Sequence, residues 1–323
     1  MSPSGVPPSA QEKSARVKPP PVFLAGPTAV GKSAVALELA EQLNGEIISV
    51  DSMQVYRGLD LGTAKPSLEQ QRRVPHHLID LVDLAESFDA ARFVQLARKA
   101  VAQIQARQHV PIFCGGTGLY FKAFLEGLGD APPLDTRLRA ELESAPLPEL
   151  LHELRLKDSQ TFTTIDRKNR RRVVRALEVI RRTGVAFSAQ RAAWNAGRRT
   201  PNAEWFFCLT RSMEDLCVRI DGRVEEMFAR GLVTETERLR SQGLERNRTA
   251  MQAIGYRQVV EHLRGERALT DTIALVKQKT RQFAKRQMTW FRGQFQPEWL
   301  MLTPSDKPGA VAEQIAERTQ IRI

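Results

Sequence analysis

Apolar runs of strand length alternate with amphipathic stretches in the first part of the chain. Four runs predict buried strands: VFLAG (22–26), EIISVDS (46–52), HHLIDLVD (76–83) and VPIFCGG (110–116). Helical spacing of apolar residues predicts three helices, the second of them capped by Asp89: 32–43, 88–108 and 117–128. Strands separated by helices of this length predict an α/β fold with a doubly wound parallel sheet.

The pattern changes at GDAPP (129–133), and residues 134–200 have helical spacing. WFFCLT (205–210) predicts a return to the sheet, and EWLML (298–302) predicts a last strand. Residues 212–292 between them are again helical, with breaks expected at Gly231, Gly243 and Gly265.

Four regions follow from this pattern. Residues 1–20 are rich in Pro, Ser and Lys and predict a disordered tail. We expect a P-loop NTPase-like core to begin at 21–130, to be interrupted by a helical insertion domain at 131–200, and to resume at 201–323 with C-terminal helices.

The core assignment depends on GPTAVGKS, which fits G-x-x-x-x-G-K-[ST] at every fixed position. In such a loop the backbone N–H groups face phosphate oxygens, Lys32 adds a positive charge, and the Ser33 hydroxyl can bind Mg²⁺. The predicted diphosphate-binding residues are Gly26, Pro27, Thr28, Ala29, Val30, Gly31, Lys32 and Ser33. The alternative is a strand–turn–helix corner that needs glycine only for its backbone.

Asp51 and Thr117 follow neighbouring predicted strands. Ligands of such sheets bind where the strands end, so we expect Gly26, Asp51 and Thr117 to surround one crevice. Asp51 could hold Mg²⁺ through water, act as a general base, or only cap a turn. Thr117 could cap the next helix or line the crevice.

Arg219 and Arg223 lie four residues apart and share one face of a predicted helix. Two arginines on one face can clamp a diphosphate. Glu225 and Glu226 are close in sequence, so surface ion pairs are the competing interpretation.

The net charge of +11 comes from two short segments. Residues 167–182 contain eight basic residues and one acid, and residues 277–292 contain six basic residues and no acid. Such concentrated charge favours a polyanion larger than one nucleotide, with two solvated helix faces as the alternative. In the second segment we expect Phe283, Trp290 and Phe291 to be core residues and the cations to follow a phosphate backbone.

Several classes of protein are disfavoured by composition. The chain has no apolar run long enough to span a membrane. Its three cysteines are odd in number and lack metal spacing, so we expect no zinc site and a reduced, cytoplasmic location. A monomer is the default expectation.

Together these segments resemble the bacterial tRNA dimethylallyltransferase (tRNA isopentenyltransferase) family. The resemblance rests on GPTAVGKS, ISVDSMQVYRGLDLGTAKP, GGTGLYFKAFLEGL, RRVVRALEVIRRTG, RVEEMFARGLVTE, AIGYRQ and TRQFAKRQMTWFR. It implies transfer of a dimethylallyl group from dimethylallyl diphosphate to the exocyclic amine of an adenosine, giving isopentenyladenosine and diphosphate. That adenosine would lie next to the anticodon, on its 3′ side, in tRNAs that read codons beginning with U. Mg²⁺ is the implied cofactor, and the tRNA anticodon stem-loop is the implied partner.

The resemblance also implies residue roles. Asp51, Thr117 and Arg223 would be catalytic, with Asp51 as general base, and Arg219 would assist Arg223 at the diphosphate. The implied tRNA contacts are Asp51, Ser52, Met53, Gln54, Thr117, Arg139, Arg171, Arg172, Arg175, Gln252, Gly255, Tyr256, Arg257, Arg281, Lys285, Arg286 and Gln287.

Two other functions compete with this interpretation. A P-loop small-molecule kinase using ATP would explain the loop and Asp51, but not the two basic segments. A non-enzymatic RNA-binding P-loop protein would explain the charge, but would leave Asp51 and Thr117 without a role.

Overall fold

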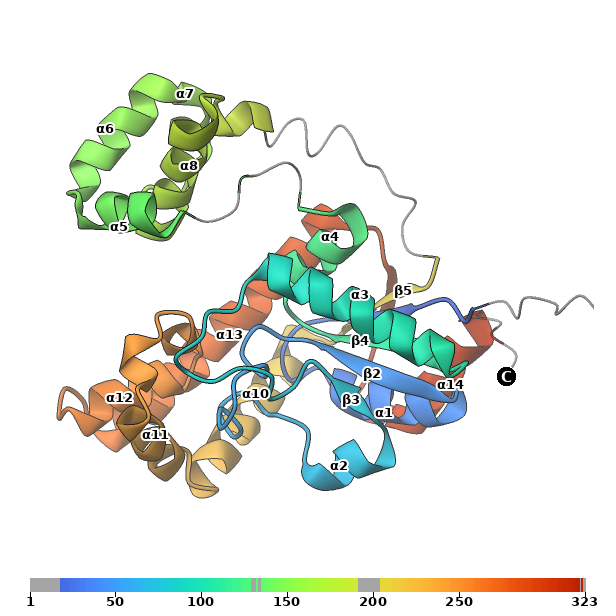
Figure 1. Ribbon diagram of the computed structural model, residues 1–323. Coiled ribbons are helices and arrows are strands. Elements are labelled where there is room, and N and C mark those ends of the chain that lie inside the picture. The colour runs from blue at the N-terminus through green and yellow to red at the C-terminus, as the bar shows by residue number, and fades with distance from the viewer. Residues whose placement is uncertain (1–17, 129–131, 133–134, 191–203, 320, 322–323) are drawn as a thin grey trace, which may run out of the picture.

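Six parallel strands form the central sheet, in the order β3-β2-β4-β1-β5-β6 (Figure 1). The computed structural model describes residues 18–128, 132, 135–190, 204–319 and 321. The strands are β1 Val22–Ala25, β2 Gly45–Val50, β3 His76–His77, β4 Val110–Gly115, β5 Phe206–Thr210 and β6 Glu298–Met301. The predicted α/β fold with a parallel sheet is confirmed, including the return of the chain at β5 and the last strand β6. The predicted tail at 1–20 lies mostly outside the described residues.

The third predicted strand, 76–83, is largely wrong. Only His76 and His77 pair with β2. Leu78 and Asp80 have φ angles of 63° and 53°, and this backbone conformation turns the chain out of the sheet. Val82 is buried and makes one isolated bridge. The apolar residues of this segment therefore fill core space without forming a ladder.

Helices cover both faces of the sheet, as Figure 1 shows. One core contains side chains of α3 (Ala90–Ala106), α4 (Gly118–Glu126), α11 (Leu232–Ser241) and α12 (Tyr256–Leu263). The other contains side chains of α1 (Lys32–Gln42), α10 (Met213–Ala229) and α14 (Pro308–Thr319). The long helix α13 (Leu269–Gln294) contributes Phe291 to the first core and Ala284 to the second. The shorter elements are α2 (Leu68–Arg73), η1 (Leu244–Arg246) and η2 (Ala250–Gln252).

Local sequence sets several of these boundaries. The side chain of Asp89 accepts a hydrogen bond from the Arg92 N–H and caps α3, as predicted. Gly231 and Gly243 have left-handed backbones and precede α11 and η1, and Gly265 lies between α12 and α13. The helix breaks expected at these three glycines are therefore confirmed. No helix of the described part of the chain is both long and apolar enough to cross a bilayer.

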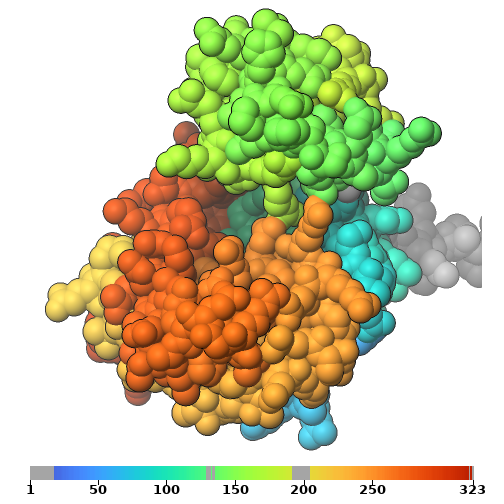
Figure 2. Space-filling view, turned by 90° about the vertical axis from the view of Figure 1, so that its left-hand side faces the viewer, coloured from blue at the N-terminus to red at the C-terminus, as the bar shows by residue number. Residues whose placement is uncertain are grey.

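Residues 135–190 include a separate group of helices with its own small core. It contains α5 (Thr136–Ser144), α6 (Leu147–Lys157), α7 (Ser159–Thr164) and α8 (Arg170–Thr183), packed around Leu142, Leu150, Leu154, Val173 and Leu177. Figure 2 shows this group above the α11–α13 side of the molecule, with a hollow between them. Arg248, which lies between η1 and η2, forms an ion pair with Glu143 of α5 across this space.

A buried carboxylate ties the amino-terminal ends of the strands together. Glu46 is 2% exposed and accepts hydrogen bonds from Arg107, His77 and His109. Burial would raise the pKa of Glu46, but these hydrogen bonds outweigh it and lower the pKa to about 2. Glu46 therefore links β2, β3 and the segment that leads into β4.

We expect this linkage to be sensitive to acid. A carboxyl with a lowered folded-state pKa stabilises the fold above its unfolded value of about 4.5, and the effect is lost as the pH falls toward about 2. Glu46→Gln should lower the unfolding free energy by up to about 3 kcal/mol at pH 7. The deficit should shrink below pH 4.5, as measured by urea unfolding at several pH values.

Glu41→Gln is the matched control, because the Glu41–Arg73 ion pair is solvent-exposed and should be worth less than about 1 kcal/mol. A deficit of the Glu46 variant that does not change with pH would contradict the assignment.

Candidate functional site

The GPTAVGKS loop leaves β1 and enters α1 in a conformation that depends on glycine. Gly26 has a φ of 146°, and a Cβ there would stand 2.5 Å from the Leu209 carbonyl oxygen. Gly31 has a φ of 110° and precedes α1 without any side-chain cap. The first N–H groups of α1 are therefore free of side-chain acceptors and point out of the helix, as an anion site requires.

Lys32 is the first residue of α1, and its side chain reaches back to the loop. Its Nζ donates to the Pro27 carbonyl at 2.6 Å. Burial lowers the pKa of Lys32 to about 8, and the positive charge of Arg223 acts in the same direction. A cation removed from water in this way is stabilised when an anion binds beside it.

Two arginines hold the backbone of the loop. Arg219 Nε donates to the Ala29 carbonyl at 2.9 Å, and Arg211 Nε donates to the Val30 carbonyl at 2.8 Å. Arg211 is almost fully buried and also binds Asp215 and the Thr303 carbonyl. Arg211 was not predicted as a site residue. Its position directly after β5, at the same edge as the loop, was the available signal.

Arg223 lies one turn after Arg219 on the same helix, α10. It is half-buried, and its pKa is lowered by burial and by nearby Arg219. It makes no hydrogen bond or ion pair with any residue that the structure describes. Glu225 pairs with Lys277 and Glu226 pairs with Arg230, so the predicted alternative of surface ion pairs for Arg219 and Arg223 is wrong.

Asp51 follows β2 at the same edge of the sheet. Its Oδ1 accepts hydrogen bonds from the N–H groups of Met53 at 2.8 Å and Gln54 at 3.3 Å. Burial raises the pKa of Asp51, while these two bonds and Lys32 act in the opposite direction. Asp51 thus caps a turn through one oxygen, and its Oδ2 accepts no hydrogen bond within the described chain. A carboxylate with one free oxygen and a raised pKa is suited to accept a proton.

Thr117 connects the β4 end to the β2 end. Its N–H donates to the Val50 carbonyl at 3.1 Å, and its Oγ1 accepts from the Ser52 N–H at 3.2 Å. The side chain does not cap α4, which decides one of the two alternatives left open by the sequence. Thr117 instead fixes the turn that contains Asp51, so the predicted grouping of both residues at one edge of the sheet is confirmed.

Gln287 of α13 also lies at this edge. It is 8% exposed, its Oε1 accepts from the Thr28 N–H at 2.9 Å, and its Nε2 donates to the Gly116 carbonyl at 2.9 Å. The family resemblance implies Gln287 as an RNA contact, but its amide is engaged by the protein on both sides. The Thr28 N–H, predicted to face a phosphate, is likewise already hydrogen-bonded.

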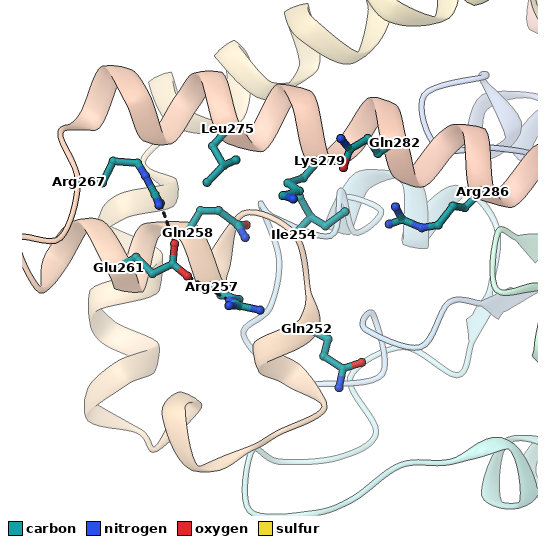
Figure 3. A pocket seen from close by; sticks show the side chains of 10 residues that line it. All are labelled: Gln252, Ile254, Arg257, Gln258, Glu261, Arg267, Leu275, Lys279, Gln282 and Arg286. Carbon is teal, nitrogen blue, oxygen red and sulfur yellow. Dashed lines mark hydrogen bonds and ion pairs between the residues drawn. The ribbon is translucent and has the colours of Figure 1, made fainter. Parts of the chain in front are cut away.

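A pocket of about 520 Å³ opens between α12 and α13 (Figure 3). Its lining is mostly polar and basic: Gln252, Ile254, Arg257, Gln258, Glu261, Arg267, Leu275, Lys279, Gln282 and Arg286. Three predicted RNA contacts, Gln252, Arg257 and Arg286, line it together. Glu261 pairs with both Arg257 and Arg267, whereas the ammonium of Lys279 has no ion-pair partner in the described chain.

Two of the RNA contacts implied for AIGYRQ lie inside the protein. Gly255 is buried, and Tyr256 is completely inaccessible. The Tyr256 hydroxyl donates to Glu235 at 2.6 Å and accepts from the Gly62 N–H at 3.1 Å. Tyr256 therefore anchors the DLGTAKP turn to α11.

The second basic segment differs from the prediction in one aromatic residue. Phe291 is buried and Trp290 is partly buried, as expected, but Phe283 is 38% exposed. The Arg286 guanidinium lies over the Phe283 ring, 5.8 Å from its centroid. The core-facing positions of this part of α13 are Ala284, Gln287, Met288 and Phe291.

Several predicted basic RNA contacts are engaged within the protein. Arg175 pairs with the buried Glu178 and donates to the Pro132 carbonyl, and Arg281 pairs with Asp221 of α10. Arg139 pairs with Glu143, whereas Arg171 and Arg172 are exposed at the start of α8. Lys285 and Arg286 are also exposed.

The donor set at the loop fits Mg²⁺ only when a phosphate ligand is present. Ser33 is exposed at the start of α1, and its hydroxyl has no hydrogen-bond partner in the described part of the chain. The described residues contain no group of three or more His, Cys, Asp or Glu side chains arranged to hold a metal. Mg²⁺ is commonly bound by few protein oxygens together with substrate phosphates, which agrees with this arrangement.

Comparison with known proteins gives one consistent family. The family model described as IPP transferase matches residues 54–294. A tRNA dimethylallyltransferase of Trichlorobacter lovleyi is 46% identical over 88% of this chain and 94% of its own length. One of Thermomicrobium roseum is 43% identical over 93% of this chain and 91% of its own.

Solved structures agree. The tRNA isopentenylpyrophosphate transferase of Staphylococcus epidermidis is 34% identical, covers 94% of this chain and 99% of its own, and has a TM-score of 0.67. A eukaryotic dimethylallyltransferase described as acting on tRNA is 28% identical, covers 92% of this chain and 77% of its own, and has a TM-score of 0.76.

Tyr256 and Arg257 are adjacent in sequence, but only Tyr256 should contribute strongly to the free energy of unfolding. Tyr256→Phe should lower the unfolding free energy by about 1–3 kcal/mol, because Glu235 and the Gly62 N–H lose a buried partner. Arg257→Ala should cost less than about 1 kcal/mol, because its ion pair with Glu261 is exposed. Thermal and urea unfolding measure both, and equal losses would contradict the assigned roles.

Proposed function

The chain belongs to the IPP transferase family and transfers a dimethylallyl group to tRNA, and we propose that dimethylallyl diphosphate is the donor. The proposed acceptor is the exocyclic amine of the adenosine on the 3′ side of the anticodon, in tRNAs that read codons beginning with U. The products are isopentenyladenosine and diphosphate. We propose that the enzyme acts as a monomer in the cytoplasm.

The observation that carries this proposal is the grouping of Lys32, Arg223 and Asp51. Lys32 follows the loop that leaves β1, and Asp51 follows β2 at the same edge of the sheet. Arg223 lies one turn after Arg219, which holds the Ala29 carbonyl of that loop. Loop N–H groups and two cations suit a diphosphate leaving group, because its negative charge increases as the bond to carbon breaks. A carboxylate at the facing edge suits an amine that must lose a proton.

The proposed reaction is a displacement at the allylic carbon. The exocyclic nitrogen forms a bond to that carbon, and the bond from the carbon to the bridging oxygen breaks. The electron pair of the broken bond leaves with diphosphate, which Lys32 and Arg223 stabilise. The proton released from the nitrogen passes to Oδ2 of Asp51. The target base must leave the anticodon-loop stack to reach this crevice.

Mg²⁺ fits this proposal through Ser33 and the diphosphate itself. When bound, it would supply positive charge to the phosphate oxygens. The protein groups that would contact the diphosphate are Lys32, Arg223 and the backbone of Gly31.

The kinase alternative is not favoured. The family model describes an IPP transferase, and the relatives are named as dimethylallyltransferases of tRNA. A kinase for a small metabolite would also have no use for a basic pocket on α12 and α13 or for the exposed arginines of α8.

The direct test is incubation with labelled dimethylallyl diphosphate and undermodified tRNA, followed by nucleoside analysis. Labelled isopentenyladenosine is expected, and ATP-dependent phosphorylation without prenylation would reject the proposal.

Asp51→Asn should slow transfer by about 10²–10⁴-fold, because the amide keeps the turn but cannot take the proton. Single-turnover rates measure the chemical step, and filter binding measures tRNA affinity, which should change little. In the wild-type enzyme the rate should rise with pH through the folded-state pKa of Asp51, which burial raises. A wild-type rate in the Asn variant would exclude the general-base role.

Lys285→Ala/Arg286→Ala should weaken tRNA binding and make it less dependent on salt. Removing one cation that neutralises a phosphate should reduce the slope of log K against log salt by about 0.7–0.9. Affinity for inorganic diphosphate should be unchanged. A matched Lys307→Ala variant alters an exposed lysine just before α14 and should retain the wild-type salt slope. An unchanged slope in the double variant would show that α13 does not contact the RNA backbone.

A further inference from the structure

The two loops of the proposed site are joined by one side chain from a third element. The Gln287 side chain accepts a hydrogen bond from the Thr28 N–H of the GPTAVGKS loop, which follows β1. It also donates a hydrogen bond to the Gly116 carbonyl of the turn that follows β4. We propose that Gln287 is a positioning residue that sets the separation of these loops, and thereby the approach of the amine to the allylic carbon. This inference rests on the proposed function.

The contact between Gln287 and the turn that follows β4 leaves no free space. A Cβ on Gly116 would stand 2.2 Å from Nε2 of Gln287, and 3.3 Å from the Gly26 carbonyl oxygen. Glycine at position 116 therefore allows the amide to lie directly against the loop backbone. Both polar atoms of the Gln287 amide are engaged, so the side chain has one fixed orientation.

One turn further along α13, Trp290 makes a second contact of the same kind. A Cβ on Gly118 would stand 2.1 Å from the Trp290 ring. Positions 287 and 290 lie on one face of α13, and their contacts at Gly116 and Gly118 enclose Thr117 between them. We call the contacts of Gln287 at Gly116 and of Trp290 at Gly118 the α13 clamp. Thr117 accepts a hydrogen bond from the Ser52 N–H, so this clamp also supports the turn that contains Asp51.

The opposite side of α13 is exposed to solvent. Lys285 and Arg286, the proposed contacts to the RNA backbone, immediately precede Gln287. RNA held on this helix is therefore held on the same rigid element that fixes both loops. Misplacement of reacting groups by about 1 Å can cost about 100-fold in rate, so loss of this clamp should appear in kcat.

A double-mutant cycle tests the inference. Gln287→Ala removes both hydrogen bonds, and Gly116→Ala displaces the Gln287 amide by the clash at Nε2. Each single variant should lower kcat about 100-fold, with KM for tRNA and for dimethylallyl diphosphate changed by less than about 3-fold. The double variant should lose no more than either single variant, because both substitutions disrupt the same pair of Gln287 hydrogen bonds. Losses that multiply to about 10⁴-fold would overturn the proposal.

Two further variants distinguish positioning from side-chain packing and from direct RNA binding. Gln287→Met preserves side-chain volume without the hydrogen bonds and should behave like the Ala variant, so a wild-type kcat would assign the effect to packing. A raised KM for tRNA with unchanged kcat would instead identify Gln287 as a direct RNA contact. Thr289→Ala is the control, since among the described residues the Thr289 hydroxyl binds only the Lys285 carbonyl of its own helix. Absence of transfer by the wild-type enzyme would reject the proposed function itself, whereas wild-type kcat in Gln287→Ala rejects only this inference.

Discussion

The site depends on three neighbouring parallel strands that end at the same level. Ala25 of β1 is in register with Gly115 of β4, and Gly115 is in register with Val50 of β2. The next residues are therefore Gly26, Gly116 and Asp51, side by side at one edge. Adjacent strands lie about 4.8 Å apart, so the phosphate loop and the carboxylate are separated by roughly 10 Å, with the Thr117 turn between them. A Cβ at Gly115 would stand 2.1 Å from the Val50 carbonyl oxygen, which explains why the middle strand ends in glycine.

Burial removes Lys32, Arg223 and Asp51 from water, which makes the charged form of each side chain less stable. Burial lowers the pKa of Lys32 and Arg223 and raises that of Asp51, so each loses part of its preference for the charged form. A diphosphate beside the two cations would restore that preference, and an amine proton is what Asp51 can accept. The energetic cost of burial in the free protein thus favours the ligands that the proposed reaction requires.

The sequence predicts those parts of the site that depend on local signals. GPTAVGKS, the strand ending in Asp51 and the strand ending in Gly115 were placed correctly, because glycine and strand periodicity are local signals. The sequence does not show hydrogen bonds between residues that are distant along the chain. Tyr256 belongs to a conspicuous motif, but its hydroxyl serves Glu235 and Gly62, and only the folded chain shows that. The double role of Gln287 between Thr28 and Gly116 has no local signature either.

The number of charges in a segment also does not show which of them are paired in the folded chain. The basic segments look almost free of acids in sequence, yet acids from other helices neutralise several of their arginines and lysines. Arg181 pairs with Glu141 and Glu153, Arg281 with Asp221, and Lys277 with Glu225. Exposed cations include Arg171 and Arg172 at the start of α8, and Lys285 and Arg286 in the middle of α13. Lys279 and Arg286 of α13 line the pocket seen in Figure 3. The exposed cations of these two helices are therefore where the net charge of +11 would attract a polyanion.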